Sequence, residues 1–182
     1  QNGDASFSLE EPGRYTMSWT SATNELQGGV GWKGGSPTIV HYSGSFGSGI
    51  SNSQNLVLSY YGNYIDNSEA FPRPIYLYII ESYGSYNPGN CAGVNLGSYQ
   101  SDGATYLLRR CEISRPSIPE LLTPRYYYAV RTPKKYFGPI SGTISFGNHM
   151  AAWRGLNVQL TQPINYMIMS TEAYRSSGNS DI

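Results

Sequence analysis

The sequence predicts an all-β fold in which two antiparallel sheets pack together and carry one short helix. Short segments of alternating apolar and polar residues recur along the chain, separated by clusters of Gly, Asn, Ser and Asp. The 182 residues include 17 Tyr, 5 Phe and 3 Trp, an aromatic content that disordered chains do not have. Only one segment has a helical pattern. Because no linker divides the chain, we expect a single domain over residues 1–182.

The elements follow from this alternation in chain order. The predicted strands are Arg14–Thr20, Thr38–Ser45, Gln54–Tyr61, Ile75–Tyr83, Ala92–Tyr99, Ala104–Cys111, Arg125–Thr132, Gly142–Phe146 and Ile164–Arg175. The helix is expected within Asn148–Leu156, with Asn148 as its N-cap and Gly155 as its stop signal.

The two cysteines are predicted to form a disulfide across one hairpin. Ser101-Asp102-Gly103 is a turn sequence, because Asp-Gly readily adopts the positive φ angles of a tight turn. The ladder that starts at this turn brings Cys91 nearly opposite Cys111, if one bulge is allowed. The alternative is a pair of reduced cysteines that are buried separately.

Charge and hydropathy exclude several classes of protein. Lys and Arg number 12 and Asp and Glu number 12, so the chain lacks the basic face of a nucleic-acid-binding protein or a polybasic membrane patch. No apolar run reaches the length of a transmembrane helix. The polar N-terminus carries no leader pattern, and a disulfide favours an oxidising compartment. We therefore expect a mature, secreted monomer with no nucleic-acid or membrane partner.

The polar residues give no sign of a metal or cofactor site. The chain has two histidines and two cysteines, and these lie too far apart in the sequence for a local metal cluster or a Cys–His nucleophile. His41 lies in a predicted strand and His149 in the predicted helix, and both are interpreted as structural. We expect no metal and no cofactor.

Glu172 is the carboxylate that the strand pattern singles out. In Ile164–Arg175, period-2 geometry places five side chains on one face: Tyr166, Ile168, Ser170, Glu172 and Tyr174. A carboxyl group between tyrosines can act as a general acid, because partial desolvation favours its protonated form. The alternative is a solvated Glu172 paired with Arg175 or another surface cation.

The strand Ile75–Tyr83 has one aromatic face. Tyr76, Tyr78 and Ile80 share this face, which resembles a platform on which sugar rings stack. Glu81 points to the other face, and we do not expect it to take part in chemistry on the tyrosine side.

Taken together, these segments resemble glycoside hydrolase family 11, the small endo-1,4-β-xylanases. The matching stretches begin with Gly28-Gly29-Val30-Gly31-Trp32, Tyr42-Ser43-Gly44-Ser45, Leu58-Ser59-Tyr60-Tyr61-Gly62 and Tyr78-Ile79-Ile80-Glu81-Ser82-Tyr83-Gly84. They continue with Tyr86-Asn87-Pro88, Ser101-Asp102-Gly103-Ala104-Thr105-Tyr106, Pro116-Ser117-Ile118, Val130-Arg131 and Asn148-His149 before Trp153. The last are Asn165-Tyr166 and Thr171-Glu172-Ala173-Tyr174-Arg175-Ser176-Ser177-Gly178.

This resemblance implies a β-jelly roll of two curved sheets with a xylan cleft on the concave face and one helix behind. It implies that xylan or xylo-oligosaccharide is the ligand and that Glu172 is the acid/base. Glu25 occupies the position that tunes the acid/base, where the family has Asn or Asp. The cysteine spacing resembles the acid-active fungal branch. The implied substrate-binding residues are the cleft tyrosines and the thumb loop: Tyr61, Tyr78, Tyr166, Tyr174, Pro116, Ser117 and Ile118.

The sequence departs from the family at the catalytic centre. Family members are retaining enzymes, which need two carboxyl groups roughly 5–5.5 Å apart. Alignment on Glu81 places Tyr76 at the nucleophile position, and alignment on Pro74 places Leu77 there. Glu112 replaces the thumb-base Arg and Tyr126 replaces a Gln of the cleft.

These departures predict a xylan-binding protein of this family whose hydrolysis of β-1,4-xylan is impaired. One alternative is an active retaining endo-1,4-β-xylanase whose sequence is misassigned at positions such as 76, 112 and 126. Another is a non-catalytic carbohydrate-binding, decoy or inhibitor protein.

Overall fold

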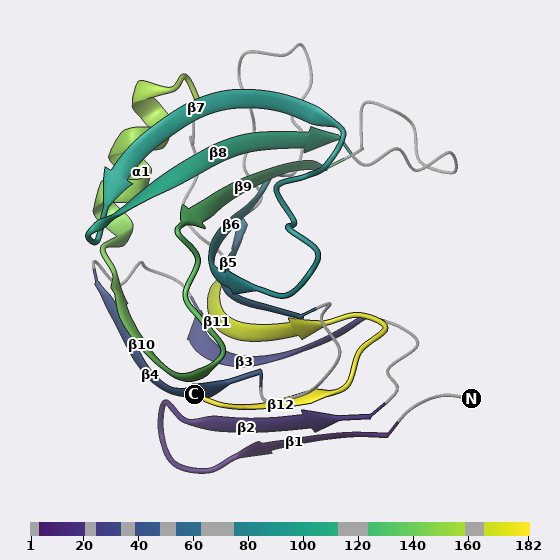
Figure 1. Cartoon of the computed structure of the whole chain (residues 1–182). Coiled ribbons are helices and arrows are strands. Elements are labelled where there is room, and N and C mark those ends of the chain that lie inside the picture. Colours follow the sequence, from purple (N-terminus) through teal and green to yellow (C-terminus); the bar gives the residue numbers. More distant parts are fainter. Residues whose placement is uncertain are drawn as a thin grey trace.

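The computed structural model describes residues 4–20, 25–33, 39–47, 54–62, 75–112, 124–158 and 166–182, with only the backbone of residues 54–62 and of residue 112. Its strands form two packed sheets, and the larger one curves into an arch that is open on one side (Figure 1). The helix α1 lies on the convex side of this arch, close to β7.

The smaller sheet, sheet A, has the order β1-β2-β12-β4-β10. Its strands are β1 (Ala5–Leu9), β2 (Tyr15–Trp19), β12 (Gly178–Asp181), β4 (Val40–Phe46) and β10 (Gly138–Ile144). The larger sheet, sheet B, has the order β3-β11-β5-β6-β9-β8-β7. Its strands are β3 (Leu26–Lys33), β11 (Tyr166–Ala173), β5 (Gln54–Gly62), β6 (Ile75–Tyr83), β9 (Arg125–Thr132), β8 (Ala104–Glu112) and β7 (Gly93–Ser101). The β6–β9 pair is parallel, and the other described pairs are antiparallel.

Strand β6 shows how the alternation builds two faces. Ile75, Leu77 and Ile79 belong to the main core, which fills the space between the two sheets. Tyr78 and Ile80 belong to a second cluster on the opposite, concave face of sheet B, against which Tyr76 packs. The predicted division of this strand into a tyrosine face and an apolar face is confirmed, and so is the all-β jelly-roll class.

The sequence pattern missed β1, β3 and β12. It also began β10 four residues too late and ended it two residues too late. Strand β3 has little alternation because it is rich in glycine. The backbone of the neighbouring strand β11 lies too close for larger residues at some of these positions. A Cβ atom at Gly31 would lie 1.8 Å from the carbonyl oxygen of Met167 on β11. Close backbone approach therefore explains a strand that composition alone assigns to a loop.

The helix α1 runs from Phe146 to Gly155. It ends at Gly155 as predicted, but Asn148 is not its N-cap, because the carbonyl of Ser145 already accepts the N–H of Asn148 at 2.8 Å. The hydroxyl of Ser145 donates instead to Asp102 at 2.6 Å. The hairpin turn therefore anchors the start of the helix.

The β7–β8 hairpin confirms the predicted disulfide. Its turn is one residue tighter than the sequence indicated, since Ser101 pairs with Ala104, and Asp102 and Gly103 have φ angles of 50° and 70°. A register shift between Asn95 and Gly97 supplies the expected bulge. Cys91 is bonded to Cys111, with 5.7 Å between their Cα atoms.

Replacing both cysteines, C91A with C111A, should lower the free energy of unfolding by about 3 kcal/mol. The bond closes a loop with a sequence separation of 20, and opening it restores chain entropy to the unfolded state. Urea titration followed by tryptophan fluorescence measures the loss. The wild-type chain in a reductant is the matched control, because it keeps both sulfur atoms, and equal stability of oxidised and reduced protein would contradict the expectation.

Candidate functional site

A row of four tyrosines lies on the concave face of sheet B, on the parallel strands β6 and β9. Tyr76 pairs in register with Tyr126, and Tyr78 pairs with Tyr128. The ring centroids lie 5.2 Å apart for Tyr76 and Tyr126, 6.4 Å for Tyr78 and Tyr126, and 5.0 Å for Tyr78 and Tyr128. These four residues, called the tyrosine row below, form a continuous series of ring contacts, in which Tyr78 and Tyr126 are buried.

Two residues that differ from the family pattern contact each other in the tyrosine row. Tyr76 stands at the position expected for the nucleophile, and its ring packs against Tyr126, at the position expected for a Gln. Leu77 is fully buried in the core between the sheets. Of the two residues that alignment places at the nucleophile position, only Tyr76 therefore lies on the concave face.

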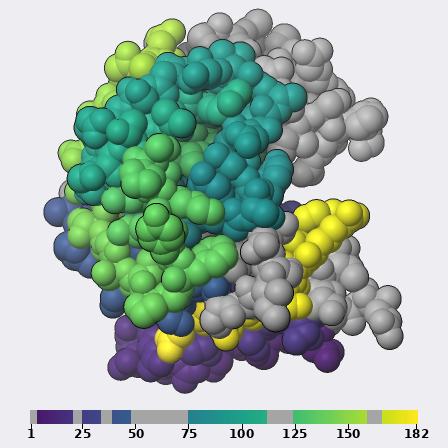
Figure 2. Space-filling view, in the orientation of Figure 1, coloured from purple at the N-terminus to yellow at the C-terminus, as the bar shows by residue number. Residues whose placement is uncertain are grey.

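Glu172 lies in a cavity of about 430 Å³ at the end of the tyrosine row. The cavity is lined by Glu25, Tyr86, Pro88, Tyr128, Glu172, Ala173 and Tyr174. Its residues come from segments that are far apart in the sequence, and Figure 2 shows the teal segment that includes β6–β8 approaching the yellow C-terminal segment on the right of the view. Tyr128 belongs both to the tyrosine row and to the lining, so the two features are continuous.

The neighbouring strand β3 holds the Glu172 carboxylate. Glu172 pairs in register with Gln27, whose Nε2 donates to Glu172 Oε1 at 2.9 Å and to Ser170 Oγ at 3.2 Å. The guanidinium of Arg175 lies over the ring of Tyr174, 5.1 Å from its centroid. Sequence reasoning missed Gln27, because only the register of β3 on β11 places it opposite Glu172.

The two carboxyl groups of the cavity affect Tyr128. Burial raises the pKa of Tyr128, and the negative charge of Glu172 raises it further, with a smaller contribution from Glu25. The phenol therefore stays protonated over the physiological range, and Tyr128 offers the cavity a hydroxyl that can donate a hydrogen bond.

The structure brings part of the predicted site together. Glu25, Glu172 and Tyr174 share the cavity, whereas Tyr76 and Tyr78 lie in the tyrosine row. Tyr166 is 40% exposed at the start of β11. The backbone of Tyr61 pairs with both Tyr76 and Tyr166. The side chains of Tyr61 and Glu112, and all of Pro116, Ser117 and Ile118, lie outside the described part of the chain.

Glu81 is fully buried on the opposite face of β6, as predicted. Tyr42 of β4 donates to its Oε2 at 2.6 Å, and Tyr106 of β8 donates to its Oε1. Arg131 Nη1 donates in turn to the hydroxyl of Tyr106 at 3.2 Å. Burial, reinforced by the charge of Glu81, raises the pKa of both phenols, so they remain donors. Glu81 therefore links the two sheets inside the core.

Both histidines have structural partners. His41 Nδ1 lies 3.1 Å from Thr143 Oγ1 on the neighbouring strand. His149 is fully buried. Its Nδ1 lies 2.7 Å from the hydroxyl of Tyr99, which accepts from Trp153 Nε1 at 3.0 Å, and its Nε2 faces Asp102 Oδ2 at 3.4 Å. Within the described residues, no three His, Cys, Asp or Glu side chains are grouped to hold a metal ion.

The fold and this face define a class of protein: a β-jelly roll whose concave sheet carries a row of aromatic rings and a pocket with two carboxyl groups. The comparisons identify the family. The model of glycosyl hydrolases family 11 matches residues 1–182, so this chain belongs to that family, as its sequence resemblance predicted.

Several relatives carry the name endo-1,4-beta-xylanase. The chain is 47% identical to Endo-1,4-beta-xylanase Xyn11B of Cellvibrio japonicus, which aligns with 100% of this chain and 49% of its own length. It is 46% identical to the bifunctional xylanase/xylan deacetylase of the same organism, over 100% of this chain and 26% of that protein. It is 42% identical to an endo-1,4-beta-xylanase of Phaedon cochleariae, and the alignment covers 100% of this chain and 81% of that protein. The chain thus spans about half or less of the two Cellvibrio proteins.

A solved structure agrees with the fold. One of two compared endo-1,4-beta-xylanases from Trichodrema reesei superposes with a TM-score of 0.75 at 27% sequence identity. The match covers 100% of this chain and 92% of that chain. No helix among the described residues has the length and apolar character to cross a membrane.

The buried His149 should make the protein less stable as the pH falls from 6.5 to about 4. Burial lowers the pKa of His149 to about 4, although the charge of Asp102 acts in the opposite direction. Below pH 6.5 the unfolded chain takes up a proton that the folded chain does not, which costs up to about 3 kcal/mol of stability. Urea titrations at intervals of pH measure this slope.

The variant H149Q is the matched control for this slope. Its amide can replace the contacts to Tyr99 and Asp102 but cannot titrate, so its stability should change less than that of the wild type between pH 6.5 and 4. Parallel curves for the two proteins would show that His149 does not titrate as described.

Proposed function

We propose that this chain binds β-1,4-xylan or xylo-oligosaccharides along the concave face of sheet B, and that it lacks the covalent route of hydrolysis. Membership of glycosyl hydrolases family 11 and the xylanase names of the relatives support the ligand class. The contact between Tyr76 and Tyr126 at the nucleophile position carries the second part of the proposal.

The aromatic side chains of this face suit a flat, uncharged sugar. Pyranose rings present apolar faces that stack on aromatic rings, while their hydroxyls bond to tyrosine tips and carboxylates. Tyr86, Tyr166 and Tyr174 are 56%, 40% and 46% exposed, so their rings are available for stacking. The cavity at Glu172 supplies carboxylate and phenol groups beside them.

Glu172 is proposed as the acid/base, with Glu25 tuning it. Retention needs a nucleophile that attacks the anomeric carbon while the acid protonates the leaving oxygen. With Tyr76 at the nucleophile position, the carboxylate ester to the sugar cannot form there. An inverting route would need a base on the opposite face of the sugar, roughly 6.5–9.5 Å from the acid. Glu25 shares the Glu172 cavity and therefore lies on the same side.

Two other functions remain as alternatives. An active retaining xylanase requires that the natural chain carries a carboxylate at position 76, which peptide mass spectrometry across residues 73–84 decides directly. A decoy or inhibitor protein requires a sugar-binding face without turnover, and the tyrosine row is compatible with it.

We also propose that residues 1–182 form one domain, which is secreted and monomeric and needs no metal or cofactor. The Cys91–Cys111 bond supports secretion, because structural disulfides persist in oxidising compartments. Glycosidic cleavage needs carboxyl groups and shape only, which supports the absence of a cofactor.

Titration calorimetry with xylohexaose should detect binding, and Y166A or Y174A should weaken it about fivefold. Removing one stacked ring costs about 1 kcal/mol beyond its buried area. The variant Y136A is the control, because Tyr136 is 83% exposed on a segment outside the cavity lining and the tyrosine row, and it should bind as the wild type does. No heat at millimolar ligand would count against the proposed ligand class.

Restoring the carboxylate should restore hydrolysis. We expect the wild type to release little reducing sugar from xylan, Y76E to release more, and Y76E with Y126Q to release most, because Tyr126 packs against residue 76. Adding E172Q to the double variant should abolish this activity, and Y76F should stay inactive. The proposal fails if the wild type, with its sequence confirmed by mass spectrometry, hydrolyses xylan at ordinary xylanase rates.

A further inference from the structure

An arginine stands next to the tyrosine row on the concave face of sheet B. Arg109 of β8 pairs in register with Tyr128 of β9. On β8, Tyr106 and Leu108 point into the core between the sheets, whereas Cys111 belongs to the concave cluster. Because strand side chains alternate, Arg109 points to the concave face beside Tyr128, with their Cβ atoms about 5 Å apart. The face proposed to bind xylan therefore carries a positive charge beside its tyrosines.

No described residue forms a hydrogen bond or an ion pair with the guanidinium group of Arg109. Its Nε is buried and has no hydrogen-bond partner, and the ion pairs of the described residues do not include it. Asn95 of β7, its other neighbour in the ladder, uses its Oδ1 to accept the N–H of Gly97 at 3.0 Å. Burying part of a charged group without a partner is costly. An anionic ligand would remove this cost.

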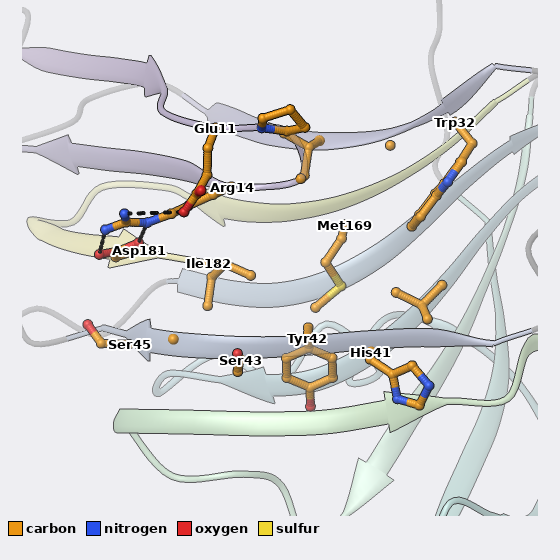
Figure 3. A pocket seen from close by; sticks show the side chains of 16 residues that line it. Glu11, Arg14, Trp32, His41, Tyr42, Ser43, Ser45, Met169, Asp181 and Ile182 are labelled. Carbon is orange, nitrogen blue, oxygen red and sulfur yellow. Dashed lines mark hydrogen bonds and ion pairs between the residues drawn. The ribbon is translucent and has the colours of Figure 1, made fainter.

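Another arginine of this protein shows which partner a guanidinium group takes when one is at hand. Arg14 donates from Nε to Asp181 Oδ1 at 2.9 Å and from Nη2 to Oδ2 at 2.8 Å, so one carboxylate accepts two parallel hydrogen bonds (Figure 3). A planar carboxylate matches the fork of donors on an arginine. Arg109 has the same fork of donors, and the described part of the chain supplies no carboxylate to it.

The loop that follows β6 holds the stem of Arg109 in place. This loop is fixed at its end by the Cys91–Cys111 bond. A Cβ atom at Gly89 would lie 2.9 Å from Val130 Cγ2 and 3.8 Å from Arg109 Cδ, so the loop backbone packs directly on the stem. Arg109 is half-buried, and of its nitrogens only Nε is both buried and unpaired. The exposed part is therefore the outer end with Nη1 and Nη2, which is held ready for a ligand.

The same loop connects Arg109 with the Glu172 cavity. Its residues Tyr86 and Pro88 line that cavity, and so does Tyr128. In the order of sheet B, β8 lies beyond β9 on the side away from β11. Arg109 is therefore adjacent to the cavity wall but on the far side of Tyr128 from the carboxyl groups inside the cavity, which would repel an anion. Leu107, on the same face of β8, is 43% exposed, so this part of the face is open.

We propose that Arg109 binds the carboxylate of a uronic acid side group, so that the protein prefers acidic xylan to unsubstituted xylan. The inference rests on the proposed binding of xylan to this face. Xylose is a pentose without a C6 atom, so the carboxylate belongs to a hexuronic side group and not to the main chain. The tyrosines contact the neutral main chain, and Arg109 donates from Nη1 and Nη2 to the two oxygens of the side group.

Titration calorimetry with three xylohexaose ligands tests this preference. The first ligand is unsubstituted, the second carries one glucuronic acid on an internal xylose, and the third carries the methyl ester of that acid. The wild type should bind the acidic ligand about tenfold more tightly than the other two, because hydrogen bonds to a charged group contribute more than neutral ones. Raising the salt concentration from about 0.01 M to about 1 M should reduce the preference, since salt screens an exposed ion pair.

The variant R109Q should bind the acidic and the unsubstituted ligand with equal affinity. The variant R154Q is the matched control, because it removes the same charge from an exposed position at the end of α1, on the convex side of the arch (Figure 1). It should keep the preference of the wild type. Equal loss of the preference in both variants would attribute it to net charge and would overturn the inference.

The methyl ester keeps the test decisive even if R109Q does not fold. Equal affinity of the wild type for the acidic ligand and its ester would overturn the role of Arg109, while heat with the unsubstituted ligand would still support the proposed binding of xylan. Heat with the acidic ligand alone would support the role of Arg109. Absence of heat with all three ligands at millimolar concentration would reject both the inference and the proposed function.

Discussion

The buried carboxylate of Glu81 is the constraint on which the arrangement of this protein depends. A buried polar group is costly unless it is hydrogen-bonded. Here one donor comes from sheet A, through Tyr42, and the other from sheet B, through Tyr106. The carboxyl group therefore connects the two sheets, on the same face of β6 as the apolar core residues Ile75, Leu77 and Ile79. Tyr76 and Tyr78 must then look outward, into the concave face.

The outward face of β6 is aromatic. Tyr76, at the position expected for the nucleophile, packs on Tyr126, at the position expected for a polar cleft residue. Each ring removes apolar surface of the other from water, so the two substitutions support one another. A single reversion at either position would leave a polar group against a ring. This coupling explains why the catalytic and the packing consequences have to be tested with a double variant.

Asp102 connects the hairpin to the helix. Its positive φ angle forms the turn, and its carboxylate accepts from the hydroxyl and the amide of Ser145, which precedes α1. The same carboxylate faces His149 in the interior. A residue that the sequence marks only as a turn former thus fixes the start of the helix and the surroundings of a buried histidine. The burial of that histidine makes the stability of the fold depend on pH, and the charge of Asp102 reduces this dependence.

The sequence by itself determined the properties that depend on neighbouring residues along the chain. The two faces of β6, the face that carries Glu172, the Asp102-Gly103 turn and the cysteine pairing across it all follow from period-2 geometry and local turn chemistry. The family resemblance added the jelly roll and the position of Tyr76. The tertiary structure alone decided the pairing of distant strands. The parallel register of β6 on β9 brings Tyr76 against Tyr126, and the register of β3 on β11 brings Gln27 to Glu172. It also decided that the glycine-rich β3 is a strand. The reason is physical: alternation is a property of one strand, whereas register results from how all the strands share one core.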